Sequence, residues 1–176
     1  ATKKVHYEAN REKLGAINPT SSDDPNAVLS GFANAKMGEW IDSAIEADLQ
    51  QEGAKDYTAK YRQGKRLVQN ENGTFLRPSV VYCESFDHPL SNREFLCPYA
   101  SVVEAPQKDM LSLIGPTLVV TAISNDACFR NDLLAAPNIE RLNLGPISTM
   151  KISWDQPHEG NMFEFLYKRR SIGIAA

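Results

Sequence analysis

Residues 75–82 read Phe-Leu-Arg-Pro-Ser-Val-Val-Tyr, and residues 92–103 read Asn-Arg-Glu-Phe-Leu-Cys-Pro-Tyr-Ala-Ser-Val-Val. The first stretch is rich in β-branched and aromatic residues, which favour strands. Its proline, Pro78, has no backbone donor, and this predicts a sheet edge or the entrance of a strand. Residues 101–104, which begin within the second stretch and centre on two valines, predict another strand.

The sequence on either side of these stretches alternates between strand and helix patterns. Residues 65–69 predict a strand, joined to residues 74–82 by a hairpin-type turn, Asn70-Glu71-Asn72-Gly73. Further strands are predicted at 117–122, 139–144, 150–153 and 171–175, with helices at 107–113, 126–135 and 161–169. The alternation predicts an α/β fold with a mostly parallel sheet and flanking helices.

The N-terminal third predicts helices separated by a loop. Residues 3–14 predict a helix that Gly15 ends, and residues 18–26, rich in Asn, Asp, Ser and Pro, predict an exposed loop. Apolar residues then recur at steps of three and four, which predicts a helix at 35–51 ended by Gly53. We expect its apolar stripe to face the core: Met37, Trp40, Ile41, Ala44, Ile45 and Leu49.

The composition is that of an ordinary globular domain and excludes several classes of partner. The chain has 176 residues, of which 42% are hydrophobic, and a formal net charge of -3. Scattered basic residues predict neither nucleic-acid binding nor an anionic-membrane surface, and no apolar run is long enough to span a bilayer. Three cysteines without a C-x-x-C pair predict neither a metal site nor a disulfide framework, so we expect a cytoplasmic protein with reduced thiols.

The segments at 75–81, 87–90 and 92–103 resemble one passage of the aldehyde dehydrogenases. In that family a strand of the form G-x-F-x-x-P-T-V precedes the motif E-E-I-F-G-P-V-x-x-V by a similar interval. The resemblance is looser at residues 17–19 and 30–40 and after residue 141, where the usual P-F-G-G-x-K-x-S-G passage is missing. It implies a divergent branch, with residues 1–170 forming the C-terminal part of the catalytic domain and residues 171–176 a terminal oligomerisation strand.

The resemblance implies two cofactor-binding residues. When the motifs are matched on their proline, Glu94 falls where the family has a Glu that hydrogen-bonds the nicotinamide ribose. A carboxylate that accepts from two vicinal hydroxyls is a compact way to hold a ribose. Leu96 falls where the family has a Phe that packs on the cofactor, and Cys97 where it has Gly. The alternative for Glu94 is a helix cap or a surface ion pair with Arg93.

No catalytic residue is assigned within the chain. The family's nucleophile lies in a G-Q-x-C loop, and no such sequence occurs here. We therefore expect the nucleophilic cysteine to lie upstream of residue 1, and Cys97 to be a packing residue. Adjacent His158 and Glu159 form too small a cluster to predict a metal site and favour a structural loop. A small hydrolase that uses Cys97 with His158 is a competing hypothesis.

The function implied by the resemblance is that of a parent enzyme rather than of this chain alone. Such an enzyme oxidises an aldehyde to a carboxylic acid through a cysteine thioester and reduces NAD or NADP. We expect these 176 residues by themselves to be inactive, and the intact protein to form a homo-oligomer through the terminal strand. The alternative from another class is a non-catalytic fragment or pseudoenzyme that acts in oligomer formation.

Overall fold

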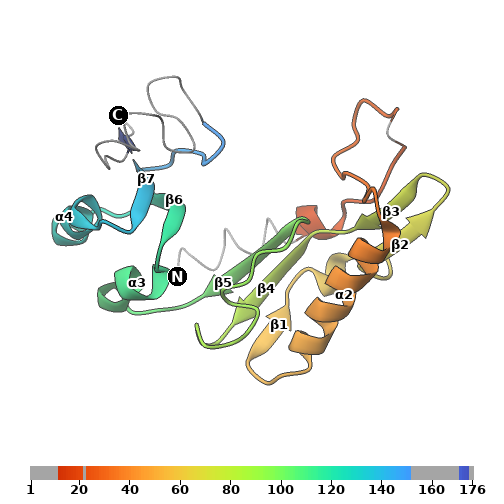
Figure 1. The fold of residues 1–176 in the computed structure, drawn as a ribbon, viewed down its shortest axis with the longest axis horizontal. Helices are drawn as coiled ribbons and strands as arrows, with labels where there is room; N and C mark the ends of the chain where they lie inside the picture. Colours follow the sequence, from red (N-terminus) through yellow and green to blue (C-terminus); the bar gives the residue numbers. More distant parts are fainter. Residues whose placement is uncertain (1–11, 22, 152–170, 175–176) are drawn as a thin grey trace. The chain divides into compact units, whose positions relative to one another are not determined.

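The computed structural model describes residues 12–21, 23–151 and 171–174. The chain divides into two compact units, Ala1–Glu104 and Ala105–Ala176 (Figure 1). Each unit has its own hydrophobic core. Both units combine helices with sheets, which confirms the predicted α/β class. The first unit contains α2 (Ala35–Leu49), β1 (Ala54–Asp56), the 3-10 helix η1 (Ala59–Tyr61), β2 (Leu67–Asn70), β3 (Gly73–Leu76), β4 (Ser79–Cys83) and β5 (Tyr99–Val103).

Strand β4 is the centre of the first unit. It pairs with β1 in antiparallel and with β5 in parallel orientation, and four of its five residues are buried. Its core neighbours include Ile41 and Ile45 of α2 and Leu90 and Phe95 of the segment that leads to β5. The sheet is therefore mixed, and β4 reads as a near-continuous apolar run because helix and loop cover it.

The hairpin forms as predicted, but the second predicted strand is divided. Strands β2 and β3 pair in antiparallel register from Leu67↔Leu76 to Asn70↔Gly73, and Gly73 has a φ of 127°, a conformation that suits glycine. The predicted strand at 74–82 breaks at Pro78, after which β4 enters a different sheet. Pro78 therefore marks a strand entrance, where its missing donor interrupts no ladder.

Helix α2 begins after Asn34, whose side chain accepts a hydrogen bond from the Lys36 backbone N–H, and it ends two residues before the predicted limit. Its buried residues are Gly38, Ile41 and Ile45. The expectation that Met37 and Trp40 belong to the core face is wrong, because these residues are 44% and 59% exposed. The helix instead approaches the hairpin at Gly38, where an added Cβ would lie 2.9 Å from Thr74 Cγ2.

The second unit is a parallel sheet with helices. It contains α3 (Gln107–Ile114), β6 (Thr117–Ala122), α4 (Ala127–Ala135), β7 (Ile139–Leu144) and β8 (Ser171–Ile174). The strand order is β6-β7-β8, and both pairings are parallel. Strand β7 lies in the middle and carries the core residues Ile139, Leu142 and Leu144, against which Leu133 of α4 packs.

The remaining expectations fall at the ends of the chain. Residues 12–15 are helical, and the end predicted at Gly15 is confirmed. Met150 and Lys151 do not form the predicted strand at 150–153, because Lys151 N–H bonds the Ser148 carbonyl in a turn. The loop at 154–160 and the helix at 161–169 lie outside the described residues. Within the described ranges no helix is long and apolar enough to cross a membrane.

A buried ionic cluster ties α2 to the strands of the first unit. The Arg66 guanidinium donates to Asp42 and Glu46 of α2 and lies 3.8 Å from Asp56 of β1. Arg62 Nη2 donates to Asp56 Oδ2 at 2.9 Å. The side chains of Arg62 and Asp56 are each 6% exposed, and that of Arg66 is 2% exposed, so each charge needs its partner.

Replacing Asp56 with Asn should therefore destabilise the chain strongly. The substitution keeps the shape of the side chain but leaves two buried guanidinium groups without their shared carboxylate. We expect a loss of about 3 kcal/mol in the free energy of unfolding, measured by urea denaturation. Asp42→Asn is the matched control, with an expected loss of about 1 kcal/mol because Asp42 is 24% exposed. Equal losses in the two variants would contradict the central role of Asp56.

Gly15 makes a close approach that should not tolerate a side chain. A Cβ added there would lie 2.5 Å from Tyr61 Cβ and 3.1 Å from the Thr58 carbonyl oxygen. We expect Gly15→Ala to lower the free energy of unfolding by about 2 kcal/mol through overpacking. Gly31→Ala is the control, since the nearest neighbour of its Cβ would be the Phe75 ring at 3.3 Å, and it should change stability by less than about 1 kcal/mol. Thermal unfolding of both variants checks the difference.

Candidate cofactor site on the loop before β5

The loop between β4 and β5, residues 84–98, is held along its length by hydrogen bonds. The Tyr99 hydroxyl donates to the Leu90 carbonyl at 2.6 Å, and the Ser101 hydroxyl donates to the Ser91 carbonyl at 2.7 Å. Ser91 in turn donates to the carbonyl of His88 at 2.7 Å. These hydrogen bonds hold the first half of the loop against β5. The side chain of Leu90, in this half of the loop, is fully buried.

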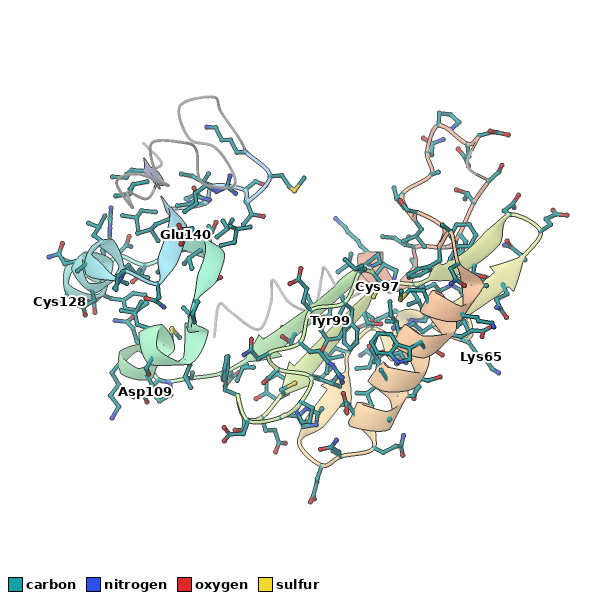
Figure 2. All side chains as sticks on the ribbon, in the orientation of Figure 1. Lys65, Cys97, Tyr99, Asp109, Cys128 and Glu140 are labelled. Atoms are coloured by element: carbon teal, nitrogen blue, oxygen red, sulfur yellow. The ribbon has the colours of Figure 1, made fainter. Side chains whose placement is uncertain are left out.

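The second half of the loop is anchored on both sides of Glu94. Phe95 is buried and packs edge-on against the Tyr99 ring, with centroids 5.0 Å apart. The Arg93 guanidinium pairs with Asp48 of α2 and lies 5.4 Å from the Phe95 ring centroid. Figure 2 labels Tyr99, the first residue of β5, and Cys97, which precedes β5 in the loop; both pack on the core to which α2 contributes.

The two predicted cofactor residues lie on this anchored segment and face solvent. Glu94 is exposed and makes no ion pair or hydrogen bond with the described side chains, so its oxygens are available as acceptors. Leu96 is 80% exposed and presents an apolar surface two residues away. The alternative pairing of Glu94 with Arg93 does not form, since Arg93 pairs with Asp48. Among the described residues, this segment therefore presents a carboxylate without a side-chain partner, Glu94, close to an exposed apolar side chain, Leu96.

The three thiols differ in their surroundings. Cys97 is half-buried against the core of the first unit, and burial raises the pKa of its thiol to about 11, although the Arg66 guanidinium opposes the rise. Cys83 is fully buried, and burial raises its pKa as well. Cys128 is exposed on α4 in the second unit (Figure 2). A raised pKa disfavours the thiolate, so Cys97 and Cys83 have the character of packing residues.

His88 is a buried turn residue. Its Nδ1 accepts a hydrogen bond from the Leu90 backbone N–H at 3.1 Å and lies 3.9 Å from Cys83 Sγ. Because Nδ1 accepts, the neutral ring carries its proton on Nε2. His158, the partner that a hydrolase with Cys97 requires, lies outside the described residues. The part of the chain that the structure describes holds no cluster of three metal-ligating side chains.

Sequence patterns did not reveal the contacts that hold this site in place. Arg93 and Asp48 are 45 residues apart, and Arg66 and Asp42 are 24 residues apart. Each of these residues reads in the sequence as an ordinary surface charge. The one available signal is that Asp42 and Glu46 are four residues apart on a helix, which places two carboxylates on one face.

Comparisons with known proteins give a clear structural match and no sequence match. No family model matches the chain, and no curated protein matches it either. A point mutant of the aldehyde dehydrogenase from Bacillus cereus is similar over 82% of this chain, with a TM-score of 0.64 and 12% identity. A candidate aldehyde dehydrogenase from Burkholderia cenocepacia is similar over 81%, with a TM-score of 0.61 and 14% identity. The NAD+ complex of the Bacillus cereus enzyme is similar over 82%, with a TM-score of 0.61 and 12% identity.

The match is one of fold and covers part of a larger structure. The chain spans 29% of the length of each of these solved structures. At such low identity the likeness concerns the arrangement of helices and strands. The fold nevertheless agrees with the resemblance that the motifs around Glu94 indicated. The chain carries part of the aldehyde dehydrogenase fold.

Proposed function

We propose that this chain is the C-terminal part of the catalytic domain of an enzyme that oxidises an aldehyde to a carboxylic acid with NAD or NADP. The observation that carries the proposal is the exposed Glu94 carboxylate on an anchored loop, in a chain that folds like part of the aldehyde dehydrogenases. Solved neighbours include an aldehyde dehydrogenase in complex with NAD+. In this proposal, Glu94 binds the cofactor and takes no proton from the substrate.

The residues of the loop suit the nicotinamide end of such a cofactor. Glu94 offers two carboxylate oxygens, which can accept from the two vicinal hydroxyls of a ribose. Leu96 offers an apolar surface for the flat face of a ring, smaller than the Phe that the family has there. When bound, the cofactor accepts a hydride from the substrate carbon. No glycine-rich phosphate motif occurs in the sequence, so the residues that hold the pyrophosphate are outside this chain in the proposal.

The nucleophile is likewise supplied from outside these residues in the proposal. A cysteine thiolate adds to the aldehyde carbon, the carbon loses a hydride, and the resulting thioester is hydrolysed by water to the acid, which returns the thiol. Neither Cys97 nor Cys83 suits this role, since burial raises the pKa of both thiols. The chain alone is therefore expected to be inactive, and its contribution is to bind and orient the cofactor.

We also propose that the intact protein is a homo-oligomer. Strand β8 lies at an edge of the parallel sheet of the second unit, with β7 as its neighbour. Its Ile174 is 62% exposed, so the strand presents an apolar side chain beside a free sheet edge within the described residues. Strand pairing between two copies would use this edge. A non-catalytic role in assembly would use the same edge and would leave Glu94 without a function.

Replacing Glu94 with Gln in the complete protein tests the cofactor role. The amide keeps the shape but removes the charge that strengthens hydrogen bonds to the ribose. We expect the KM for the nicotinamide cofactor to rise roughly ten- to a hundredfold, with a small change in the KM for the aldehyde. Glu84→Gln is the matched control, because Glu84 is an exposed carboxylate on the same loop. An unchanged cofactor KM in the Glu94 variant would refute the proposed role.

Thiol labelling distinguishes the dehydrogenase proposal from a hydrolase that uses Cys97. With a pKa of about 11, Cys97 is almost entirely protonated at pH 7 to 8, and its thiolate appears only as the pH approaches that value. We therefore expect iodoacetamide to modify the exposed Cys128 first and Cys97 slowly, with the Cys97 rate still rising above pH 9. Fast labelling of Cys97 that levels off near neutral pH would support the hydrolase. Mass spectrometry of the labelled peptides gives the order.

A further inference from the structure

We propose that Arg93 is a positioning residue, and that its ion pair with Asp48 fixes the Glu94 carboxylate on the surface where the cofactor binds. The inference rests on the proposed function of Glu94 and adds to it the device that orders this residue. It assigns a role in cofactor affinity to two charges that touch neither cofactor nor substrate.

The neighbours of Glu94 are fixed from two directions. On one side, the Arg93 guanidinium pairs with Asp48 and lies over the Phe95 ring. On the other side, Phe95 is buried and its ring meets Tyr99 at an interplanar angle of 78°. The Cys97 backbone N–H then bonds the Phe95 carbonyl at 2.8 Å and closes a tight turn. Glu94 is thus an exposed residue between two residues whose side chains have partners.

Asp48 belongs to helix α2, which packs on the core of the first unit. It lies in the last turn of α2, whose Ile41 and Ile45 are buried in the core. The same helix is fastened through Asp42 to the buried Arg66. An anchor on such an element transmits the position of the helix to the loop, whereas an anchor on another loop would move with it.

The exposure of the ion pair separates a positioning role from a structural one. The Arg93 side chain is 41% exposed and that of Asp48 is 15% exposed, and ion pairs with such access to solvent add little to folding stability. Phe95 is buried in the core, and we expect this burial to keep the unit folded when the pair is removed. Loss of the pair should therefore free the segment around Glu94 without unfolding the unit. Cofactor binding would then have to order the Glu94 carboxylate. Because this ordering costs free energy, the affinity for the cofactor would fall.

A double-mutant cycle in the complete protein tests the inference. The variants are Arg93→Gln, Asp48→Asn and the two combined, with Glu94→Gln assayed beside them. Each single change should raise the KM for the nicotinamide cofactor about three- to tenfold, with kcat and the KM for the aldehyde nearly unchanged. The combined variant should be no worse than either single one, and the melting temperature should stay within about 2 °C. Additive effects, or an unchanged cofactor KM in both single variants, would overturn the inference.

A second measurement separates failure of this inference from failure of the proposed function. Hydrogen exchange at the amides of residues 92–97, without cofactor, should speed up in Arg93→Gln and in Asp48→Asn. If exchange does not change, the ion pair does not order the loop, and the inference is wrong whatever Glu94 does. If Glu94→Gln leaves the cofactor KM unchanged, the proposed function fails and the inference falls with it. If Glu94→Gln alone weakens cofactor binding, Glu94 keeps its role and only the positioning by Arg93 is refuted.

Discussion

The first unit depends on counter-charges for one buried guanidinium, that of Arg66. A buried cation without partners costs several kcal/mol, and a side chain with 2% exposure cannot draw on water for its solvation. Its counter-charges come from separate elements: Asp42 and Glu46 of α2 accept hydrogen bonds from it, and Asp56 of β1 lies 3.8 Å away. Satisfying this charge therefore fixes the helix against the strands, and the arrangement of the unit follows from it.

The position of the candidate site depends on how α2 packs against the strands. Once α2 is fixed, Asp48 is a stationary partner for Arg93, and β4 with β5 holds the two ends of the loop that carries Glu94. The residues that do the holding are buried or paired, whereas Glu94 and Leu96 are exposed. Such an arrangement is typical of a binding surface, in which a rigid support presents a few exposed polar and apolar groups.

Burial also decides what the thiols can do. Cys97 stands beside the candidate site, and by its position in the sequence it invites assignment as a nucleophile. Its contact with the core raises its pKa to about 11 and favours the protonated thiol, which is a poor nucleophile. Cys83 is enclosed by the same core. Burial therefore argues against a nucleophilic role for Cys97 and Cys83.

The sequence by itself determined the local elements and the identity of the candidate residues. The α/β alternation, the hairpin at residues 67–76 and the ends of the second unit's strands follow from short-range patterns and turn residues. Glu94 and Leu96 could be named because the motif around them has a recognisable order. Their exposure, which any binding role requires, became visible only in the structure.

Tertiary structure alone decided which apolar residues are buried and which charges meet. The stripe on α2 predicted a buried Trp40, yet the helix approaches its hairpin at Gly38, a residue that no hydrophobic pattern counts. The helical period predicts which side of a helix is apolar, but it does not fix which of the neighbouring positions is most buried. Close packing at Gly38 places the buried side of α2 at Gly38, Ile41 and Ile45 and leaves Trp40 exposed. The pairing of Arg93 with Asp48 joins residues 45 positions apart. Such contacts depend on how the chain folds back on itself, and no local pattern encodes that.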